Sequence, residues 1–451
     1  MKYHLVSILL GFLLTVVLDT AFATTDKTNV VILLSDDQRW DVITAKYMPN
    51  VYKNVVETGI AFNNSFVPNP LCCPSRTSIL TGNHSHTTSV WSNDSPPYGG
   101  FFSFDDKDTI AIDFHQAGYR TAMIGKYLNA YNAGRNRYIP AGWDTWFAVH
   151  GSGVGADGDN EGAYYNYGVT ATKDKVPYNN GVSASKGKLL HYGHSENDYV
   201  ARVVSEQAIN FVNNSVKANK PFFLYYAFNA PHMPATPDPR DLTRFAGETK
   251  TARHDDMLES AFSMDREIGN LFAVLPKNTL VVFMSDNGYL WGESKGNRGV
   301  LNGKLWPYNE SIRVPIYITS LNGTLTPKAN RDDIVLNIDL RTTLSHAVGI
   351  TPTIQTEGID WFDSNYKART VFPLEHLRGK RGNVDTYCGV REQKFMYVRY
   401  KLKDNSYLEE LYNEPNEILN LIGNPLYRAD YNRLKSEAMN LCNPTPPGYI
   451  W

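Results

Sequence analysis

Cysteine is scarce in this chain, with four residues among 451. This excludes the kind of disulfide framework that holds small secreted domains together, so the core has to come from burial of apolar side chains. The 42% of hydrophobic residues suffices for such a core. An excess of charge is missing too, because the formal net charge is only -2. Without a basic field, the sequence gives no support for binding to nucleic acid.

A long apolar segment is also missing. Lys2 precedes an apolar run over residues 5–18, and Ala21-Phe22-Ala23 resembles a signal-peptidase site. The run is shorter than the roughly 20 residues that cross a bilayer. We therefore predict a signal peptide over residues 1–23, a mature chain without a stable membrane anchor, and the secretory route; an N-terminal membrane anchor is the alternative. Six triplets of the N-glycan acceptor type fit this compartment and begin at Asn63, Asn83, Asn93, Asn213, Asn309 and Asn322.

The four cysteines fall into two pairs. Cys388 and Cys442 lie far apart in a late segment and are the natural disulfide pair in an oxidising compartment. Cys72 and Cys73 are adjacent, and adjacent cysteines are bridged only through a strained ring. We therefore predict that at least one of these two is kept for chemistry. A buried structural pair at the start of a helix is the alternative.

Apolar runs alternate with helical patterns through most of the chain. Runs typical of buried strands cover residues 29–34, 119–124, 221–228 and 279–284. Helical patterns cover residues 108–117, 198–216, 259–275 and 338–348. The alternation predicts an α/β fold with a sheet covered on both faces. From about Gly382, short alternating runs predict a small antiparallel sheet, followed by a helix near residues 430–439. The Gly- and Asn-rich residues 150–186 are predicted as a long surface insertion.

Polar side chains follow each of the four predicted strands directly. They are Ser35-Asp36-Asp37, Gly125-Lys126, Asn229-Ala230-Pro231-His232 and Ser285-Asp286-Asn287-Gly288. Ligands bind outside the carboxyl ends of the strands in open α/β sheets, so these groups can converge on one crevice. Three carboxylates and an amide oxygen suit Ca²⁺ or Mg²⁺ better than zinc. Each cluster alone is compatible with an ordinary turn, but their joint placement favours a site.

The stretch "PLCCPSRTSILTG", residues 70–82, holds the adjacent cysteines. Pro74 suits the first position of a helix, and Gly82 suits its end. Cys72 then lies just before the helix, where free N–H groups and the helix dipole favour an anion. Arg76 adds a fixed positive charge in the first turn. A nucleophile at Cys72 would therefore meet an anionic substrate, helped by Lys126 and a divalent cation.

The pattern Cys72-x-Pro74-Ser75-Arg76-x-x-x-Leu80-Thr81-Gly82 resembles the signature of the type I sulfatases of the alkaline phosphatase superfamily. Similar segments extend from Asn29 to about Leu421 and include "SDDQ", "APHMP", "GKLWPYNESIRVP" and "NIDLRTTL". Within the family, "LCCPSR", "GKYLN" and "SDNGY" are most similar to the N-acetylglucosamine-6-sulfatase and related glucosamine-sulfatase branch.

This resemblance implies an alkaline-phosphatase-like fold. We expect a large, mostly parallel mixed sheet between helices, and a smaller C-terminal antiparallel sheet with a helix. The expected units are a catalytic domain over residues 24–375 and an α+β subdomain over residues 376–451.

The resemblance also implies roles for individual residues. Cys72 would be converted to Cα-formylglycine by a formylglycine-generating enzyme during maturation. One Ca²⁺ would be bound by an oxygen of that residue together with Asp36, Asp37, Asp286 and Asn287. Arg76 would hold the formylglycine hydrate, and the sulfate would be gripped by Lys126, His232 and Lys304. Glu310 and Arg313 match a family segment expected to form a buried structural pair.

The chemistry explains why a thiol would be replaced. A thiol attacking sulfur would give an adduct with no easy exit, whereas an aldehyde hydrate offers two hydroxyls on one carbon. One hydroxyl, activated by Ca²⁺ and a base such as Asp286, is expected to attack sulfur while His232 or Lys304 protonates the departing alcohol. The second hydroxyl then expels sulfate. Many sulfatases have a histidine two residues after the active-site lysine, but Leu128 is present here, and His86 is a candidate base instead.

The predicted reaction is hydrolysis of sulfate monoesters in the extracellular space or the lysosome. A 6-sulfated N-acetylglucosamine in a glycosaminoglycan is the leading substrate, with aryl sulfates as additional ones. A phosphatase or phosphonate monoester hydrolase of the same superfamily is one alternative, although two zinc ions would need more histidines near the aspartates. A non-catalytic glycan-binding homologue is another, although Cys72, Lys126 and the acidic residues are all present. The oligomeric state is not indicated.

Overall fold

The computed structural model describes residues 27–94, 96–131, 137–150, 164–172, 186–325, 329–380, 382–413 and 417–451. The predicted signal peptide, residues 1–23, lies outside these ranges, as does most of the predicted insertion over residues 150–186. Within the described ranges, every helix is too short or too polar to cross a bilayer.

Strands and helices alternate along the chain. The strands are β1 (Asn29–Ser35), β2 (Ile60–Phe66), β3 (Arg120–Lys126), β4 (Thr145–Val149), β5 (Tyr167–Ala171), β6 (Lys188–Tyr192), β7 (Phe222–Ala227), β8 (Thr279–Ser285), β9 (Leu290–Ser294), β10 (Val300–Gly303), β11 (Ile316–Ser320), β12 (Ala329–Leu336), β13 (Val371–His376), β14 (Thr386–Glu392), β15 (Phe395–Lys401) and β16 (Tyr407–Asn413). The helices are α1 (Pro49–Val51), α2 (Cys72–Thr81), α3 (Ser85–Thr88), α4 (Ile110–Gln116), α6 (Val200–Lys217), α7 (Ala252–Phe272), α8 (Asn309–Ile312), α9 (Asp339–Ala347) and α10 (Arg428–Leu441).

The main sheet has ten described strands in the order β12-β2-β11-β8-β1-β7-β3-β4-β5-β6. The four strands predicted from the sequence are its neighbours β8, β1, β7 and β3, and they pair in parallel. Antiparallel pairs on both flanks make the sheet mixed. The polar groups that follow the four strands therefore lie along one edge of the sheet, as predicted.

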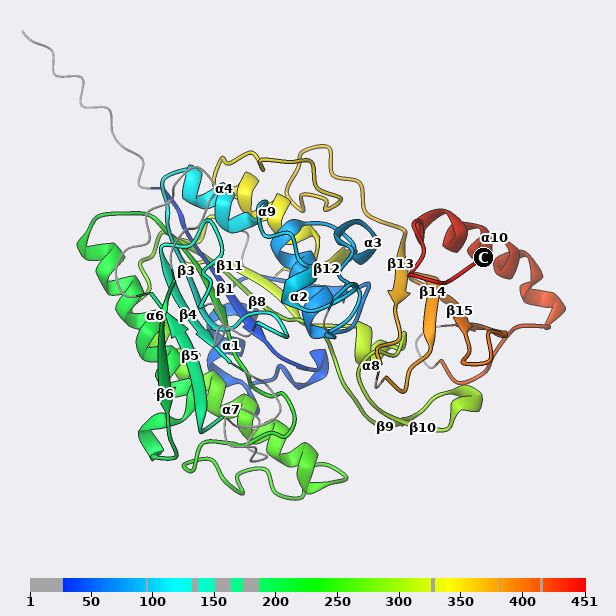
Figure 1. The fold of residues 1–451 in the computed structure, drawn as a ribbon, viewed down its shortest axis with the longest axis horizontal. Coiled ribbons are helices and arrows are strands. Elements are labelled where there is room, and N and C mark those ends of the chain that lie inside the picture. The colour runs from blue at the N-terminus through cyan, green and yellow to red at the C-terminus, as the bar shows by residue number, and fades with distance from the viewer. Residues whose placement is uncertain are drawn as a thin grey trace, which may run out of the picture.

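Helices cover both faces of this sheet (Figure 1). Alternate residues of β1 point to opposite faces, so Ile32 packs with α2, α4 and α9, whereas Leu33 packs with α6 and α7. Burial on both faces explains why the four strands have continuous apolar sequences. The predicted α/β fold, with a mostly parallel mixed sheet between helices, is confirmed.

Helix α7 begins at Ala252, seven residues before its predicted start at Glu259. Its first turns, "ARHDDML", are polar and give no apolar period, but Thr251 caps the helix by accepting a hydrogen bond from the backbone N–H of His254. Asp265 of α7 holds helix α1. Asp265 accepts from the backbone N–H groups of Asn50 and Val51, at 2.8 Å each.

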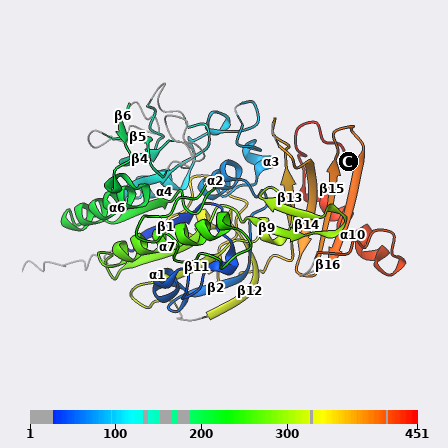
Figure 2. The same cartoon turned by 90° about the horizontal axis from the view of Figure 1, so that it is seen from below.

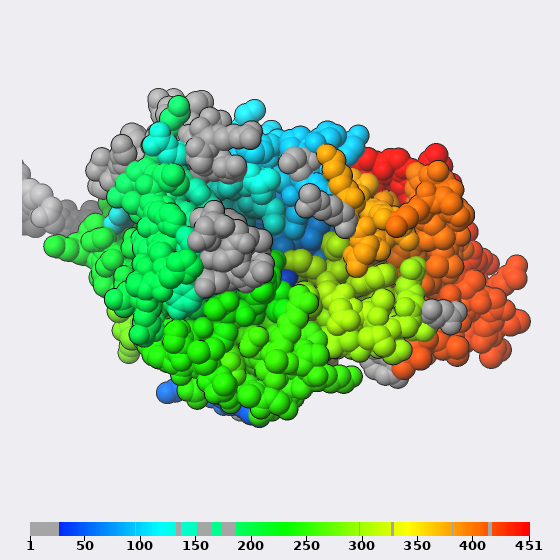
Figure 3. Space-filling model, turned by 60° about the horizontal axis from the view of Figure 1, so that its bottom comes forward, coloured from blue at the N-terminus to red at the C-terminus, as the bar shows by residue number. Residues whose placement is uncertain are grey.

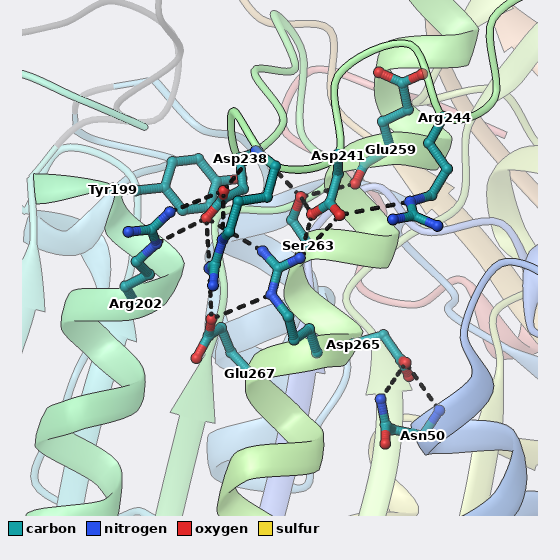
Figure 4. Close-up of polar contacts among 12 residues, drawn as sticks. Asn50, Tyr199, Arg202, Asp238, Asp241, Arg244, Glu259, Ser263, Asp265 and Glu267 are labelled. Carbon is teal, nitrogen blue, oxygen red and sulfur yellow. Dashed lines mark hydrogen bonds and ion pairs between the residues drawn. The ribbon is translucent and has the colours of Figure 1, made fainter. Parts of the chain in front are cut away.

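A network of arginines and aspartates fixes residues 233–251 onto α7 (Figure 4). Asp238 and Asp241 in this loop are fully buried. Arg202 of α6 donates to both carboxylate oxygens of Asp238, at 2.8 and 2.9 Å. Arg266 of α7 binds both oxygens of Asp241, at 2.6 and 2.8 Å, and Ser263 donates to the same carboxylate. The loop that follows His232 is therefore held by ion pairs to buried aspartates, in addition to the apolar packing of Phe245.

The C-terminal part forms a separate four-stranded antiparallel sheet, β13-β14-β15-β16, on which α10 packs (Figure 2). Cys388 on β14 and Cys442 after α10 form a disulfide, which confirms the predicted pair. The sheet starts at Val371, before the alternating runs that begin near Gly382. The sequence pattern missed β13 because this strand is buried and shows no alternation of polar and apolar residues. The domain limits at residues 24–375 and 376–451 stay predictions.

The predicted insertion over residues 150–186 is wrong in one part. Its described residues include β5, which pairs with β4 and β6 in the main sheet. Two predicted glycan acceptors are also wrong as surface sites. Asn83 is 7% exposed and Asn309 is 5% exposed, which leaves no room for a glycan. Asn63, Asn213 and Asn322 are exposed and stay predictions.

Candidate active site

The predicted groups converge at the carboxyl ends of the four central strands. Atoms of Asp36, Asp37, Cys72 and His232 that can bind a metal all lie within 4.8 Å of one another. Asp36 and Asp37 follow β1, and His232 follows β7. Cys72 reaches the same point from the start of α2. Residues that lie up to 196 positions apart, by their numbers in the chain, thus form one cluster.

Helix α2 begins at Cys72, so the prediction that Pro74 is its first residue is wrong by two positions. The first intrahelical bond runs from the N–H of Ser75 to the carbonyl of Leu71, which places Cys72 in the first turn. The N–H of Cys73 donates to Asn93 Oδ1 at 2.8 Å. Gly82 ends the helix with φ 75°, as predicted.

Both cysteines of the pair are free thiols with no exposed surface. Burial raises the pKa of the Cys72 thiol, although Lys126 and Lys304 oppose this. An unmodified Cys72 is therefore a weak nucleophile here, because the thiolate is the reactive form. Cys73 packs in the apolar core behind α2, and burial raises its pKa to about 12.

Arg76 is fully buried under the cluster. Its Nε donates to Asp286 Oδ2 at 2.7 Å, and its Nη1 donates to the carbonyl of Lys126 at 2.8 Å. Its Nη2 lies 3.8 Å from Asp36 Oδ2. The guanidinium thus joins the ends of β1, β3 and β8, and a lysine could not replace its fixed fork of donors.

Two lysines bring positive charge to the carboxylates. Lys126 Nζ donates to Asp36 Oδ2. Lys304 Nζ lies 2.6 Å from Asp37 Oδ1 and 2.9 Å from the Cys72 sulfur. Burial lowers the pKa of a lysine, but the attraction of Asp37 and Cys72 outweighs it and holds the pKa of Lys304 well above its ordinary value.

His232 follows a cis peptide bond between Ala230 and Pro231. Its Nε2 lies 3.7 Å from Asp37 Oδ2, and its carbonyl accepts from Tyr164 at 3.1 Å. Burial lowers the pKa of His232 to about 4, against the opposing pull of Asp36. The imidazole is therefore neutral at pH 7 in this arrangement.

The fixed charges of the site balance. Burial by itself would raise the pKa of Asp36 and Asp37, but their cationic neighbours hold both values below the ordinary one. Three carboxylates, those of Asp36, Asp37 and Asp286, face three cationic side chains, those of Arg76, Lys126 and Lys304. Buried charges are stable only when paired in this way.

The donor set fits a hard divalent cation. Carboxylate oxygens of Asp36 and Asp37 lie together, and the Oδ1 of Asn287 is buried with no hydrogen-bond partner among the described residues. Asn287 Nδ2 donates to Asp37 Oδ1 at 2.7 Å, which fixes the amide beside the cluster. Asp286 adjoins it, and its Oδ1 accepts from the backbone N–H groups of Asp37 and Asn287. Oxygen ligands of this kind suit Ca²⁺ or Mg²⁺.

His86 does not fit the role of a free base. Its Nδ1 lies 2.8 Å from Glu375, and its Nε2 lies 3.4 Å from Glu357. These bonds outweigh burial and raise the pKa of His86 to about 10, so the ring is protonated and holds two carboxylates together. Leu128, at the position of the missing histidine, is a buried core residue.

The pair predicted from "NESIRVP" takes other partners. Glu310 forms an ion pair with Lys295 at 2.9 Å, whereas Arg313 donates to the carbonyl of Asn63 and lies over the ring of Trp40. Sequence reasoning also missed Glu357 and Glu375, because they come from distant segments and no motif marks them.

The fold and the site together define an α/β protein with a buried, charge-balanced polar cluster at the ends of its central strands. One solved structure of the same fold is described as a complex with its substrate D-glucosamine-2-N,6-O-disulfate. The TM-score is 0.74 at 20% identity, over 94% of this chain and 100% of that one.

The sulfatase family model matches residues 28–350, and a model described as N-sulphoglucosamine sulphohydrolase, C-terminal, matches residues 296–443. The chain therefore belongs to the sulfatase family. A Sulf-1 homolog of Caenorhabditis elegans is 29% identical over 73% of this chain and 48% of its own length. Human N-acetylglucosamine-6-sulfatase is 28% identical over 72% of this chain and 62% of its own length. The chain thus spans about half to three fifths of these two relatives.

Proposed function

We propose that this protein is a sulfatase that hydrolyses sulfate monoesters of glucosamine-type sugars, and aryl sulfates as additional substrates. The observation that carries the proposal is the position of Cys72. The cysteine of the sulfatase signature lies at the start of a helix, 2.9 Å from an ammonium group and within 4.8 Å of two carboxylates and a histidine. The relatives named after N-acetylglucosamine-6-sulfate, and the fold neighbour with a sulfated glucosamine, support the sugar class.

Two groups beyond the unmodified chain complete the proposed site. Cys72 is converted to Cα-formylglycine by a formylglycine-generating enzyme, and its hydrate supplies the oxygen nucleophile. Asp36, Asp37, Asp286, Asn287 and the modified residue would hold Ca²⁺, which supplies Lewis-acid activation of the nucleophile and of the sulfate. Since the fixed charges of the site already balance, a divalent cation gives it a net positive charge that suits an anionic ester.

The chain's own residues then have separate tasks. Arg76, anchored on Asp286, holds the residue at position 72 in place. Lys126 and Lys304 present ammonium groups to the sulfuryl oxygens, where charge develops as the ester bond breaks. Lys304 and His232 both adjoin Asp37 and are the two candidates for protonating the departing alcohol. Lys304 is charged and has the proton to give, whereas the neutral ring of His232 would first have to gain one. His86 is not available as the base for sulfate release, because its ring is bound to Glu357 and Glu375.

Other features of the chain support a compartment for this function. The signal-peptide pattern, the disulfide and the exposed Asn-x-Ser/Thr triplets support the secretory pathway, with an extracellular or lysosomal destination. Relatives described as extracellular sulfatases agree with this.

The test is the mass of the proteolytic peptide that contains Cys72, together with hydrolysis of 4-nitrophenyl sulfate. In protein from a secretory host, the peptide should show loss of sulfur and gain of an aldehyde oxygen, and Cys72→Ala should abolish hydrolysis. Cys73→Ala is the matched control and should retain activity. An unmodified thiol, or a bridge to Cys73, in a host able to make formylglycine would overturn the proposal. Faster turnover of 4-nitrophenyl phosphate or a phosphonate ester would favour a phosphatase or phosphonate hydrolase. Binding of a sulfated glycan without its hydrolysis would favour a glycan-binding protein.

A further inference from the structure

Lys304 sits on a backbone held in an unusual conformation. Gly303 and Leu305, on either side of it, have φ values of 90° and 80°. A left-handed conformation is easy for glycine but unfavourable for leucine, whose Cβ approaches the neighbouring carbonyl. Such a residue persists only where its surroundings hold it. The direction of the Lys304 side chain therefore depends on the contacts that keep Leu305 in this conformation.

Both peptide groups of Leu305 are held by other parts of the chain. Its N–H donates to the carbonyl of Pro70, two residues before Cys72, at 3.2 Å. Its carbonyl accepts from the hydroxyl of Tyr387, at 2.9 Å. Tyr387 lies on β14 of the C-terminal sheet and is fully buried. Leu305 thus joins the segment of the nucleophile to the C-terminal sheet.

The segment around Lys304, coloured yellow-green, lies against the orange C-terminal part in Figure 3. Ion pairs and a hydrogen bond hold this segment on both sides of Lys304. Lys295 binds Glu417 at 2.7 Å. Arg298 and Tyr308 both bind Glu410 of β16, at 2.8 and 3.0 Å. The loop that carries Lys304 is therefore fastened to the C-terminal part before, at and after the lysine, and Tyr387 makes the contact nearest to it.

We propose that Tyr387 is a positioning residue for the active site. Its hydroxyl holds the Leu305 carbonyl, and through that peptide it keeps the Lys304 ammonium group beside residue 72. The inference rests on the proposed function, in which Lys304 grips the sulfate. It makes the C-terminal sheet part of the catalytic unit, although the sheet supplies none of the proposed ligands.

The test is Tyr387→Phe, which removes the hydroxyl and keeps the ring that packs on His376 and Tyr400. Tyr397→Phe is the matched control. Tyr397 is also fully buried in this sheet, and its hydroxyl donates to Glu409 at 3.0 Å. Backbone hydrogen exchange of residues 303–306 reports on the loop without any need for activity. Exchange should become about 10-fold faster in Tyr387→Phe and stay unchanged in Tyr397→Phe.

Kinetics with 4-nitrophenyl sulfate report on Lys304. Tyr387→Phe should lower kcat/KM about 10-fold. In a protein that already carries Lys304→Met, the same change should lower kcat/KM by less than about 2-fold, because both substitutions act through the Lys304 ammonium group. Equal exchange and equal kinetics in the two tyrosine variants would overturn the inference. So would an undiminished effect in the Lys304→Met background, which would show a general structural loss. If the unaltered protein hydrolyses no sulfate ester, the proposed function fails, and the exchange rates alone decide whether Tyr387 holds the loop.

Discussion

The ammonium nitrogen of Lys304 lies 2.9 Å from the sulfur of Cys72. Position 72 is where the reacting oxygen would stand after conversion to formylglycine, so this charge is aimed at the reaction centre. Lys304→Met should lower kcat/KM for an aryl sulfate by about 10²- to 10³-fold, the usual effect of removing one preorganised group that stabilises developing charge. Steady-state kinetics check this, with the exposed Lys277→Met as control. Unchanged kcat would show that Lys304 contributes only to binding.

Calcium should stabilise the folded protein through Asp37. A ligand that binds only the folded state at 100 times its Kd adds about 2.7 kcal/mol to the free energy of unfolding. We therefore expect CaCl₂ to raise Tm, and Asp37→Asn to abolish the increase. Asp41→Asn, a change in an exposed side chain nearby, should respond to calcium like the unaltered protein. A larger increase with ZnCl₂ than with CaCl₂ would contradict the oxygen-ligand site.

His86 should stabilise the protein most at acid pH. The pKa of His86 is raised from 6.5 to about 10, so its contribution is complete below pH 6.5 and is lost as the pH rises through about 10. The pKa of Glu357 is lowered to about 2, so that contribution is complete above pH 4.5. His86→Gln should lower the free energy of unfolding by about 3 kcal/mol at pH 5.5, and by progressively less towards pH 9.

Urea unfolding at a series of pH values measures this difference. His346→Gln is the control, because His346 pairs with Asp360 but is 44% exposed, and surface pairs contribute little. A loss of stability in His86→Gln that is the same at pH 5.5 and pH 9 would show that the ring packs there without carrying charge.

The disulfide between Cys388 and Cys442 should stabilise the C-terminal part. It closes a loop with a sequence separation of 54, for which chain entropy gives about 4 kcal/mol. Replacement of both cysteines by serine should lower Tm and first release α10 from its sheet, as local hydrogen exchange would show. Unchanged exchange in α10 would mean that its apolar contacts with β14 and β15 are sufficient.

The sequence predicts the central strands and their terminal carboxylates because these strands are buried on both faces. Continuous apolar runs, such as the one before Asp36, are a strong local signal. Because these strands pair in parallel, the residues that follow them, such as Lys126 and Asp286, lie at the same end of the sheet. Local sequence patterns do not predict a contact whose partner lies far away in the chain. The polar start of α7 depends on a single cap at Thr251, and no local feature of His86 announces Glu375, 289 positions away.

Cys72 has no exposed surface, and two of the residues around it, His232 and Lys304, come much later in the chain. Lys304 follows it by 232 positions, so at about 5–20 residues per second a ribosome needs about 10–50 s to pass from one to the other. During that interval the cysteine lacks Lys304, so the proposed modifying enzyme could reach it. The proposed conversion of Cys72 would therefore have to be finished before the later parts of the chain enclose this residue.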